Sequence, residues 1–330
     1  MTESEMADNI VCSVLVACYN HENYIEDVLK SLYYQTYDNI ELLICDDCST
    51  DHSWEKIQEY LKDKKERFIS VKLIRHEQNK GLVEGLLEML AASTGVIVKD
   101  MAGDDIFGET YFEDIVQAYL SGDDNTVYLT NSYLIGENDH YEALKNNRYE
   151  VFYKDAPDFT QKTLFQRMFQ QNMIFGVGIA APRKLHSEYG TYDRNTIVED
   201  WDLWLNWAST GKVTFQFIDK PDVYYRKSEG SMTSLIKNET MAKRWLALFA
   251  ACEAIIDKYG SYFSKEDYAK RKWEYYLYEG GMMRAYAFGS EKELLRGKMR
   301  KFLKENGKYL PLIYHIRYYR MKLRGTMVLP

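Results

Sequence analysis

The first 135 residues alternate between short apolar runs and helical patterns, and this alternation limits the folds open to the chain. Five runs rich in aliphatic and β-branched residues have the length of buried strands: residues 11–17, 40–44, 71–75, 96–100 and 126–135. Segments with helical spacing of apolar residues separate them: residues 23–35, 53–64, 81–93 and 111–120. Strands and helices that alternate in this way form right-handed βαβ units. The sequence therefore predicts an α/β fold with a Rossmann-like, mainly parallel sheet flanked by helices.

The pattern changes in the second half of the chain. One further helix and three further strands are predicted: residues 163–171 for the helix, and residues 174–181, 213–218 and 223–226 for the strands. From about Met241 the chain has a helical pattern almost to its end, with breaks near Gly260, Ser290 and Pro311. We therefore predict two domains, residues 1–235 and a helical C-terminal region over residues 236–330.

Composition narrows the class of protein. No apolar run approaches the roughly 20 residues of a membrane-spanning helix, and the N-terminal MTESEMADN is too polar for a signal peptide. The 5 cysteines are an odd number without framework spacing, which is typical of a protein kept reduced. We therefore expect a cytoplasmic protein.

The net charge of −8 hides an asymmetry. Residues 291–330 contain eleven Lys or Arg and three Glu, a net charge of +8, so the rest of the chain carries −16. A basic end favours an anionic partner. Because no nucleic-acid-reading motif accompanies these residues, we expect peripheral contact with an anionic membrane at the inner face of the cell membrane. Packing of this segment as core, and a homodimer through it, stay open as alternatives.

Acidic pairs directly follow two of the predicted strands. Asp46 and Asp47 follow the strand 40–44, and Asp104 and Asp105 follow the strand 96–100. Ligands of an open parallel sheet bind beyond the carboxyl ends of its strands. Clustered carboxylates repel one another unless a cation compensates, and Mg²⁺ or Mn²⁺ with substrate phosphates does so economically. The pattern predicts a divalent metal and a phosphate-containing ligand at this edge.

Two cysteines flank the first acidic pair with C-x-x-C spacing, which suggests zinc or redox chemistry instead. Cys45 and Cys48 have no second C-x-x-C to complete a zinc site. A redox pair stands at a helix N-terminus, whereas the helix here is predicted to begin near Ser53. We therefore predict that the aspartates, and not the cysteines, are functional.

Several segments in a fixed order resemble glycosyltransferase family 2, whose catalytic domain has the GT-A fold. They are SVLVACYN, IELLICDDCSTDHS, NKGL, AGDD and VEDWDLWL, and the resemblance covers residues 11–230 approximately. It implies that residues 1–235 are a GT-A catalytic domain. Nucleotide-sugar binding would occupy about residues 11–135, and the acceptor part about residues 136–235.

The resemblance also implies the donor-site residues. Asp47 would bind a uracil ring, with Tyr19 and the backbone near Ala17 beside it. Asp104 would contact the ribose, and Asp105 would hold the Mn²⁺ or Mg²⁺ that bridges the diphosphate. NKGL resembles a family segment near the donor, but a helix N-cap with a permissive glycine explains these residues equally well.

On the acceptor side, the resemblance matches Asp200 to the catalytic base of inverting members. Trp201 would shape the acceptor site, and we place Glu199 there with it. An inverting transfer needs one carboxylate to deprotonate the acceptor hydroxyl, while the metal stabilises the departing diphosphate. The structural alternative is that Asp200 only caps the helix that follows it.

The sequence departs from the family pattern at two positions. Ala102 stands where the family often has Asp, and Ser228 stands where it often has His, so a third metal ligand from the later loop is not expected. Arg226 and Lys227 of that loop are predicted to neutralise the diphosphate, with solvated loop charges as the alternative.

Taken with the resemblance, the residues predict an inverting, metal-dependent glycosyltransferase. It would move a sugar from a nucleotide-sugar, a UDP-sugar, to a hydroxyl of a glycan or lipid-linked acceptor in surface polysaccharide synthesis. A nucleotidyltransferase is one alternative, although ACYNHENY is not a glycine- and lysine-rich phosphate loop. A catalytically inactive nucleotide-sugar-binding protein is the other; Ala102 and Ser228 favour it, and the intact Asp105 and Asp200 oppose it.

Overall fold

A computed structural model describes residues 9–144, 147–155, 157, 159, 161–174, 176–228, 239–285, 289–312 and 314. It divides into two compact units, Met1–Ser231 and Met232–Pro330. The domain boundary that the sequence places after residue 235 lies close to this division. We describe each unit by itself.

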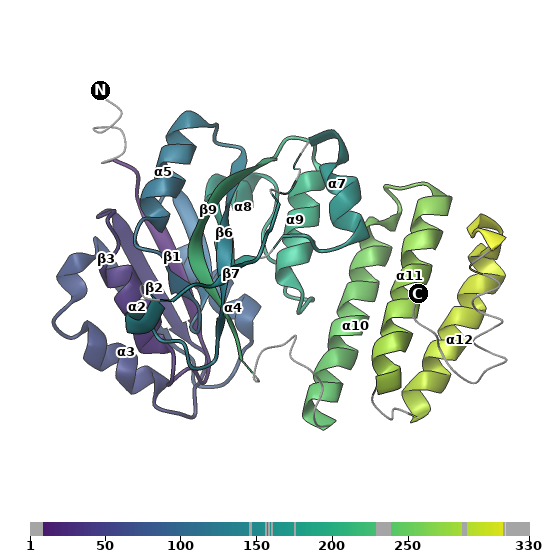
Figure 1. The fold of residues 1–330 in the computed structure, drawn as a ribbon, viewed down its shortest axis with the longest axis horizontal. Helices are drawn as coiled ribbons and strands as arrows, with labels where there is room; N and C mark the ends of the chain where they lie inside the picture. Colours follow the sequence, from purple (N-terminus) through teal and green to yellow (C-terminus); the bar gives the residue numbers. More distant parts are fainter. Residues whose placement is uncertain are drawn as a thin grey trace. The chain divides into compact units, whose positions relative to one another are not determined.

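The first unit is built on one sheet of nine strands among its described residues, shown in Figure 1. The strands are β1 (Cys12–Cys18), β2 (Ile40–Asp46), β3 (Ser70–Arg75), β4 (Ile97–Ala102), β5 (Ile106–Phe107), β6 (Thr126–Gly136), β7 (Glu150–Val151), β8 (Ile179–Pro182) and β9 (Thr214–Lys227). They lie in the order β3-β2-β1-β4-β8-β6-β9-β5, and β7 pairs with β6. The neighbours β3, β2, β1 and β4 are all parallel, as predicted, whereas β8 pairs antiparallel with both β4 and β6.

Helices connect the strands and cover the sheet. Those of the first unit are α2 (Ile25–Tyr33), α3 (Ser53–Leu61), α4 (Leu82–Ala92), α5 (Tyr111–Ser121), α6 (Tyr141–Leu144), α7 (Gln161–Gln170), α8 (Lys184–Glu188) and α9 (Glu199–Ser209). Short 3₁₀ turns lie at η1 (Lys65–Arg67) and η2 (Gly176–Gly178). The four helices predicted in the first half are all present.

Two strand predictions in the second half need correction. The predicted strand 174–181 is shortened to β8, because Gly176–Gly178 forms the turn η2. The predicted strands 213–218 and 223–226 are one continuous strand, β9. Its register against β6 shifts on either side of Asn131, opposite Pro221. Proline has no N–H to donate to a ladder, so an irregular register is expected there.

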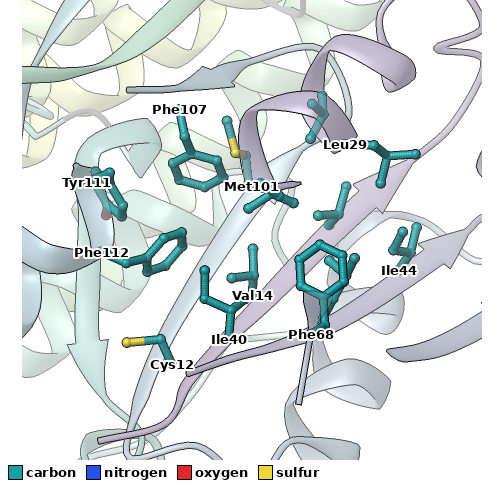
Figure 2. Close-up of a cluster of buried hydrophobic side chains, with 14 of the residues drawn as sticks. Cys12, Val14, Leu29, Ile40, Ile44, Phe68, Met101, Phe107, Tyr111 and Phe112 are labelled. Carbon is teal, nitrogen blue, oxygen red and sulfur yellow. The ribbon is translucent and has the colours of Figure 1, made fainter. Parts of the chain in front are cut away.

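The core of the first unit lies on one face of the sheet, and Figure 2 shows part of it. Val14 of β1 and Ile40 of β2 face this side, where Leu29 of α2 and Phe112 of α5 pack against them. Each such side chain contributes about 1.5–3 kcal/mol when fully buried. The opposite face also bears a helix, because α4 packs against β1 and β2. With helices on both faces, the carboxyl ends of the strands remain as the place for a ligand.

The second unit consists of α10 (Glu239–Gly260), α11 (Lys265–Ala285), α12 (Gly289–Asn306) and the turn η3 (Gly307–Tyr309). The three helices pack side by side (Figure 1). In α12, Leu295, Met299 and Phe302 recur at helical spacing and are buried. The apolar face of this basic helix therefore packs as core, one of the alternatives that the sequence left open.

No helix among the described residues is long and apolar enough to cross a membrane. Residues 315–330, the last part of the basic segment, lie outside the described residues.

Candidate active site

The carboxyl ends of three parallel strands meet at one edge of the sheet. In the ladders, Ala17 of β1 stands opposite Cys45 of β2 and opposite Ala102 of β4. The N–H of Gly103 donates to the carbonyl of Ala17 at 2.8 Å, so the loop after β4 is joined directly to the end of β1. The acidic segments that the sequence singled out are thereby neighbours in space, as predicted.

The loops after β1 and β2 are interlocked by reciprocal hydrogen bonds. The N–H of Asn20 donates to the Ser49 hydroxyl at 2.9 Å, and the Asn20 side chain accepts from the N–H of Thr50 at 2.8 Å. The N–H of Glu22 donates to Asp51 at 2.9 Å. Asn20 has φ 56°, a left-handed conformation that Asn tolerates better than most residues. Each loop thus satisfies backbone groups of the other.

Asp47, predicted to bind a uracil ring, is a buried carboxylate in a dense set of donors. Its Oδ1 accepts from His76 Nδ1 at 2.7 Å and from the N–H of Lys80 at 2.8 Å, and its Oδ2 accepts from the N–H of Gly81 at 2.8 Å. Burial alone would raise the pKa of Asp47, but these hydrogen bonds hold that pKa below its usual value. Asp47 is therefore an ionised acceptor with a fixed orientation.

The NKGL segment begins a helix and also contacts Asp47. Gly81 precedes α4 as its N-cap residue and has φ 89°, a conformation that glycine adopts without strain. The same residue and Lys80 turn their N–H groups toward Asp47. The segment starts a helix and also holds Asp47 in place.

The second acidic pair consists of two unlike carboxylates. Asp105 is only 4% exposed, and its Oδ1 accepts the N–H of Arg226 at 2.9 Å. Burial, reinforced by the charge of Asp104, raises the pKa of Asp105 well above its usual value. Asp104 is the partly exposed member of the pair. The carboxylate expected at the metal is thus the enclosed one, and the carboxylate expected at the ribose is the accessible one.

Arg226 does not have the accessible position that a role at the diphosphate requires. It is 1% exposed, and its Nε donates to the carbonyl of Asp104 at 2.8 Å. Its Nη1 donates to the carbonyls of Gly136, Glu137 and Asp139, which form the turn after β6. The guanidinium also lies 4.6 Å from the ring centroid of Tyr24. The prediction of a donor-binding Arg226 is therefore corrected, because these contacts make it the anchor of the Asp104 loop.

His21, in the loop after β1, lies against the loop that carries Asp104. Its Nδ1 is buried and has no hydrogen-bond partner among the described residues. A Cβ on Gly103 would come within 2.6 Å of this nitrogen, so only glycine fits beside the ring. Burial lowers the pKa of His21, against the opposing charge of Asp104. The imidazole is a neutral neighbour of the Asp104 carboxylate.

Asp200, predicted as the base, occupies the first turn of α9. Its Oδ1 accepts the N–H of Trp201 at 2.6 Å, and its Oδ2 accepts from Asn172 at 3.2 Å. Burial raises the pKa of Asp200, and the charge of Asp100 adds to this rise. The adjacent Glu199 also has a raised pKa, through burial and the charge of Asp200. The contact with Asn172 comes from a distant part of the chain, so capping alone does not account for the surroundings of Asp200.

Asp200 is tied to the sheet through the turn η2. A Cβ on Gly176 of this turn would lie 3.9 Å from the Cβ of Asp200. Lys99 of β4 is fully buried, and its ammonium donates to the carbonyls of Gly176 and of Asp100. Burial, followed by the charge of nearby Asp100, raises the pKa of Tyr192 well above its usual value. The end of β4 thus carries Asp104 on its loop and supports the surroundings of Asp200 through η2.

Two other predicted residues differ from one another in exposure. Trp201 is 2% exposed, and its indole N–H donates to the carbonyl of Met168 in α7 at 2.8 Å. This contact makes Trp201 a packing residue between α9 and α7, and its predicted part in shaping the acceptor site stays a prediction. Tyr19, by contrast, is 45% exposed beyond the end of β1, where a ligand could reach it.

The cysteine pair has the features of structural thiols. Cys45 lies within β2 and is buried, and burial followed by the charge of Asp47 raises its pKa to about 12. A reactive redox cysteine needs a lowered pKa, because the thiolate is its nucleophile. Cys48 is turned aside in a left-handed conformation, φ 63°, and its Sγ contacts the carbonyl of Glu77. The prediction that the aspartates are the functional residues of this stretch agrees with this arrangement.

The acidic edge fits a hard divalent cation that keeps most of its ligands outside the protein. Among the described residues, no three His, Cys, Asp or Glu side chains are grouped to enclose a metal. Mg²⁺ and Mn²⁺ need no such enclosure, because one or two carboxylates with substrate phosphates and water suffice. Asp104 supplies an accessible carboxylate of this kind.

Sequence reasoning missed several residues that the structure brings to this edge. His76 follows β3, and the segment RHEQN at the end of that strand is as polar as the ends of β2 and β4. Lys99 and Asp100 lie at the end of the predicted strand 96–100. A Lys-Asp pair inside an otherwise apolar strand was the available signal. Tyr192 lies in a loop and gave no signal.

Comparison with known proteins supports the fold. The sequence model of glycosyl transferase family 2 matches residues 13–190. Among solved structures, S. aureus TarS 1–349 in complex with UDP-GlcNAc aligns with a TM-score of 0.55 at 16% identity, covering 96% of this chain and 93% of that one. A Pyrobaculum calidifontis mannosyltransferase, PcManGT, in complex with GDP-Man and Mn²⁺, aligns with a TM-score of 0.56 at 15% identity, covering 94% and 83%. The predicted GT-A fold is confirmed.

Curated relatives are also glycosyltransferases. An uncharacterized glycosyltransferase of Haemophilus influenzae is 34% identical over 114 residues, which are 34% of this chain and 33% of that protein. The first relatives are matched over only 33% to 46% of their own length. The Escherichia coli protein UDP-Glc:alpha-D-GlcNAc-diphosphoundecaprenol beta-1,3-glucosyltransferase WfgD is 24% identical over 72% of this chain and 85% of its own length. Since the family model covers more than half of the chain, the chain belongs to glycosyltransferase family 2.

Proposed function

We propose that the protein is an inverting glycosyltransferase that moves a sugar from a uridine-diphosphate sugar to a hydroxyl of a lipid-linked glycan. The observation that carries this proposal is the meeting of the β1, β2 and β4 ends, which gathers Asp47 and Asp104 at one edge. The turn η2 connects the same edge to Asp200. Such a transfer needs a hydrogen-bond acceptor for the nucleobase, a carboxylate accessible to a metal, and a general base of raised pKa for the acceptor hydroxyl.

In the proposed reaction, the Asp200 carboxylate takes the proton of the acceptor hydroxyl. The acceptor oxygen forms a bond to the anomeric carbon on the face opposite the diphosphate. The carbon–oxygen bond to the diphosphate breaks, and UDP leaves with the bonding electron pair. Since the acceptor oxygen itself is the nucleophile, no covalent intermediate with the protein is required, and the configuration at the anomeric carbon inverts.

A divalent metal, when bound, would offset the negative charge that develops on the departing diphosphate. We propose Asp104 as the carboxylate that holds it. Asp105 would not contact the metal; it would hold the loop that carries Asp104 in place by accepting the N–H of Arg226. The Mn²⁺ of the PcManGT complex supports a divalent metal, and the UDP-GlcNAc of the TarS complex supports a uridine donor.

The nucleotide and metal assignments can be tested with one pair of variants. We expect wild-type protein to bind UDP more tightly with Mg²⁺ or Mn²⁺ than without it, as measured by calorimetry. In Asp104→Asn this gain should disappear, because the amide is a much poorer metal ligand than the carboxylate. Asp105→Asn should keep most of the gain, because the amide oxygen can still accept the Arg226 N–H.

The two variants also show which of the two carboxylates, Asp104 or Asp105, binds the metal. If Asp105→Asn loses the metal-dependent gain and Asp104→Asn keeps it, the metal ligand is Asp105, as first expected from the sequence. If wild-type protein binds UDP equally with and without metal, the metal-dependent mechanism is wrong. GDP belongs in the same series, because one structural relative was solved with GDP-Man.

For the acceptor, the support comes from the relatives. WfgD and another E. coli relative, WfaP, are named as enzymes that act on a diphosphoundecaprenol-linked sugar. A lipid-linked acceptor would lie at a membrane surface, and the basic residues of the C-terminal region suit an anionic surface. Since the apolar face of α12 is core, we propose that charge, rather than insertion of this helix, provides the attraction.

The membrane proposal predicts salt-sensitive binding to anionic vesicles. Replacing Arg317, Arg320, Lys322 and Arg324 with Glu should lower vesicle binding at least 10-fold at low salt, since each basic residue contributes about 1 kcal/mol. High salt should weaken binding of the wild-type protein, because exposed charges are screened. The control is Arg300→Glu with Lys301→Glu, which changes two exposed charges of α12. Equal co-sedimentation of all three proteins would contradict the proposal.

A further inference from the structure

His76 is a buried histidine whose two ring nitrogens both face carboxylates. It directly follows β3 and is 5% exposed. Its Nδ1 lies 2.7 Å from Asp47 Oδ1, and its Nε2 lies 3.2 Å from Glu88 Oε2 of α4. The imidazole therefore bridges the end of β2 and the helix that follows the next strand.

Counting protons restricts the state of this bridge. A neutral imidazole has one N–H, and its other nitrogen is an acceptor, as a carboxylate oxygen is. Both contacts can be hydrogen bonds at once only when both nitrogens carry a proton. The ring is held between Asp47 and Glu88, and its Nδ1 makes the shorter of the two contacts.

The other groups around the ring fit this arrangement. The Sγ of Cys45 lies 3.6 Å from Nε2, and the raised pKa of that thiol keeps it neutral. The ammonium of Lys80 bonds Glu88 Oε1 at 2.8 Å, on the oxygen that His76 leaves free. The backbone N–H of His76 donates to the carbonyl of Asp46 at 3.0 Å, which fixes the ring relative to β2.

We propose that His76 is a positioning residue for recognition of the nucleotide base. Its Nδ1 holds the Asp47 carboxylate in the orientation that accepts an N–H of the base. The inference rests on the proposed function, in which Asp47 contacts the base of the donor.

The other donors to Asp47 set the size of the expected effect. Asp47 keeps the N–H groups of Lys80 and Gly81 when the His76 contact is removed, so its orientation should be loosened rather than lost.

Two substitutions separate the two sides of the ring. His76→Asn places an amide near the position of Nδ1, where it can still donate to Asp47. His76→Gln places its amide near the position of Nε2, where it can donate to Glu88 but not to Asp47. Calorimetry with UDP and Mg²⁺ is the measurement.

We expect His76→Asn to bind UDP within about 3-fold of wild type. His76→Gln should bind about 10-fold more weakly, since a hydrogen bond to a charged group is lost.

Two outcomes would overturn the inference. They are equal affinities of the Asn and Gln variants, and a ¹⁵N spectrum in which Nδ1 of His76 lacks a proton. The His76→Asn variant assigns that spectrum. Failure of the wild-type protein to bind UDP is a different result, which would overturn the proposed function and this inference with it.

Discussion

Asp200→Asn will lower the rate of sugar transfer by about 100-fold or more and leave UDP binding unchanged. The amide keeps the size of the carboxylate and an oxygen that can accept the N–H of Trp201, so the start of α9 should be preserved. What it loses is the ability to take a proton from the acceptor hydroxyl. The measurement is UDP release with a diphosphoundecaprenol-linked acceptor, together with calorimetry of UDP. Transfer near the wild-type rate would reduce Asp200 to a helix cap.

A pH profile adds a second check on the same base. The pKa of Asp200 is raised by burial and by the charge of Asp100. A base of raised pKa is ionised only above that pKa, so activity should fall as pH drops through it. Asp100→Asn removes the neighbouring charge and should move this acidic limb to lower pH, while it keeps the size of the side chain. An unmoved limb would mean that another group controls the profile.

Arg226→Met will destabilise the first unit by about 3 kcal/mol or more, the largest stability effect that we expect. The substitution leaves the carbonyls of Asp104, Gly136, Glu137 and Asp139 without their buried donor. It also removes the cation 3.8 Å from the buried carboxylate of Asp27. Unpaired buried polar groups are costly because they have lost water without gaining a partner. Denaturant unfolding of the variant measures the loss.

The matched control is the next residue in the same strand. Lys227 is exposed at the end of β9, so Lys227→Met should change the free energy of unfolding by less than about 0.5 kcal/mol. If the two variants are equally stable, Arg226 is not the anchor of the loop. The Arg226 variant should also bind UDP more weakly where it remains folded, because the Asp104 loop loses its attachment.

The first half of the fold was predictable because its signals are local. Strands 40–44 and 71–75 alternate with helices of ordinary length, and such βαβ units have essentially one handedness. The second half was predicted less well. The turn at Gly176–Gly178 and the irregular pairing opposite Pro221 depend on which strands become neighbours. That information is not contained in either segment alone.

The site shows the same division between local and distant information. Acidic residues at strand ends predicted which edge carries the chemistry, and the register of β1, β2 and β4 brings them together. Accessibility could not be predicted, because it depends on partners far along the chain. Asp105 and Arg226 are 121 residues apart and enclose one another. Trp201 likewise meets the carbonyl of Met168 in another helix.

The interlocked loops after β1 and β2 have a consequence for engineering. Since Asn20 and Ser49 each complete the backbone hydrogen bonding of the other loop, neither loop has its full set of partners without the other. A chimera that receives only one of these two loops from a relative would leave backbone N–H groups without acceptors, even if the new loop binds its ligand well. Exchange of nucleotide preference between members of the family therefore calls for transplanting both loops as one cassette. Libraries that randomise either loop alone should return mostly unstable proteins.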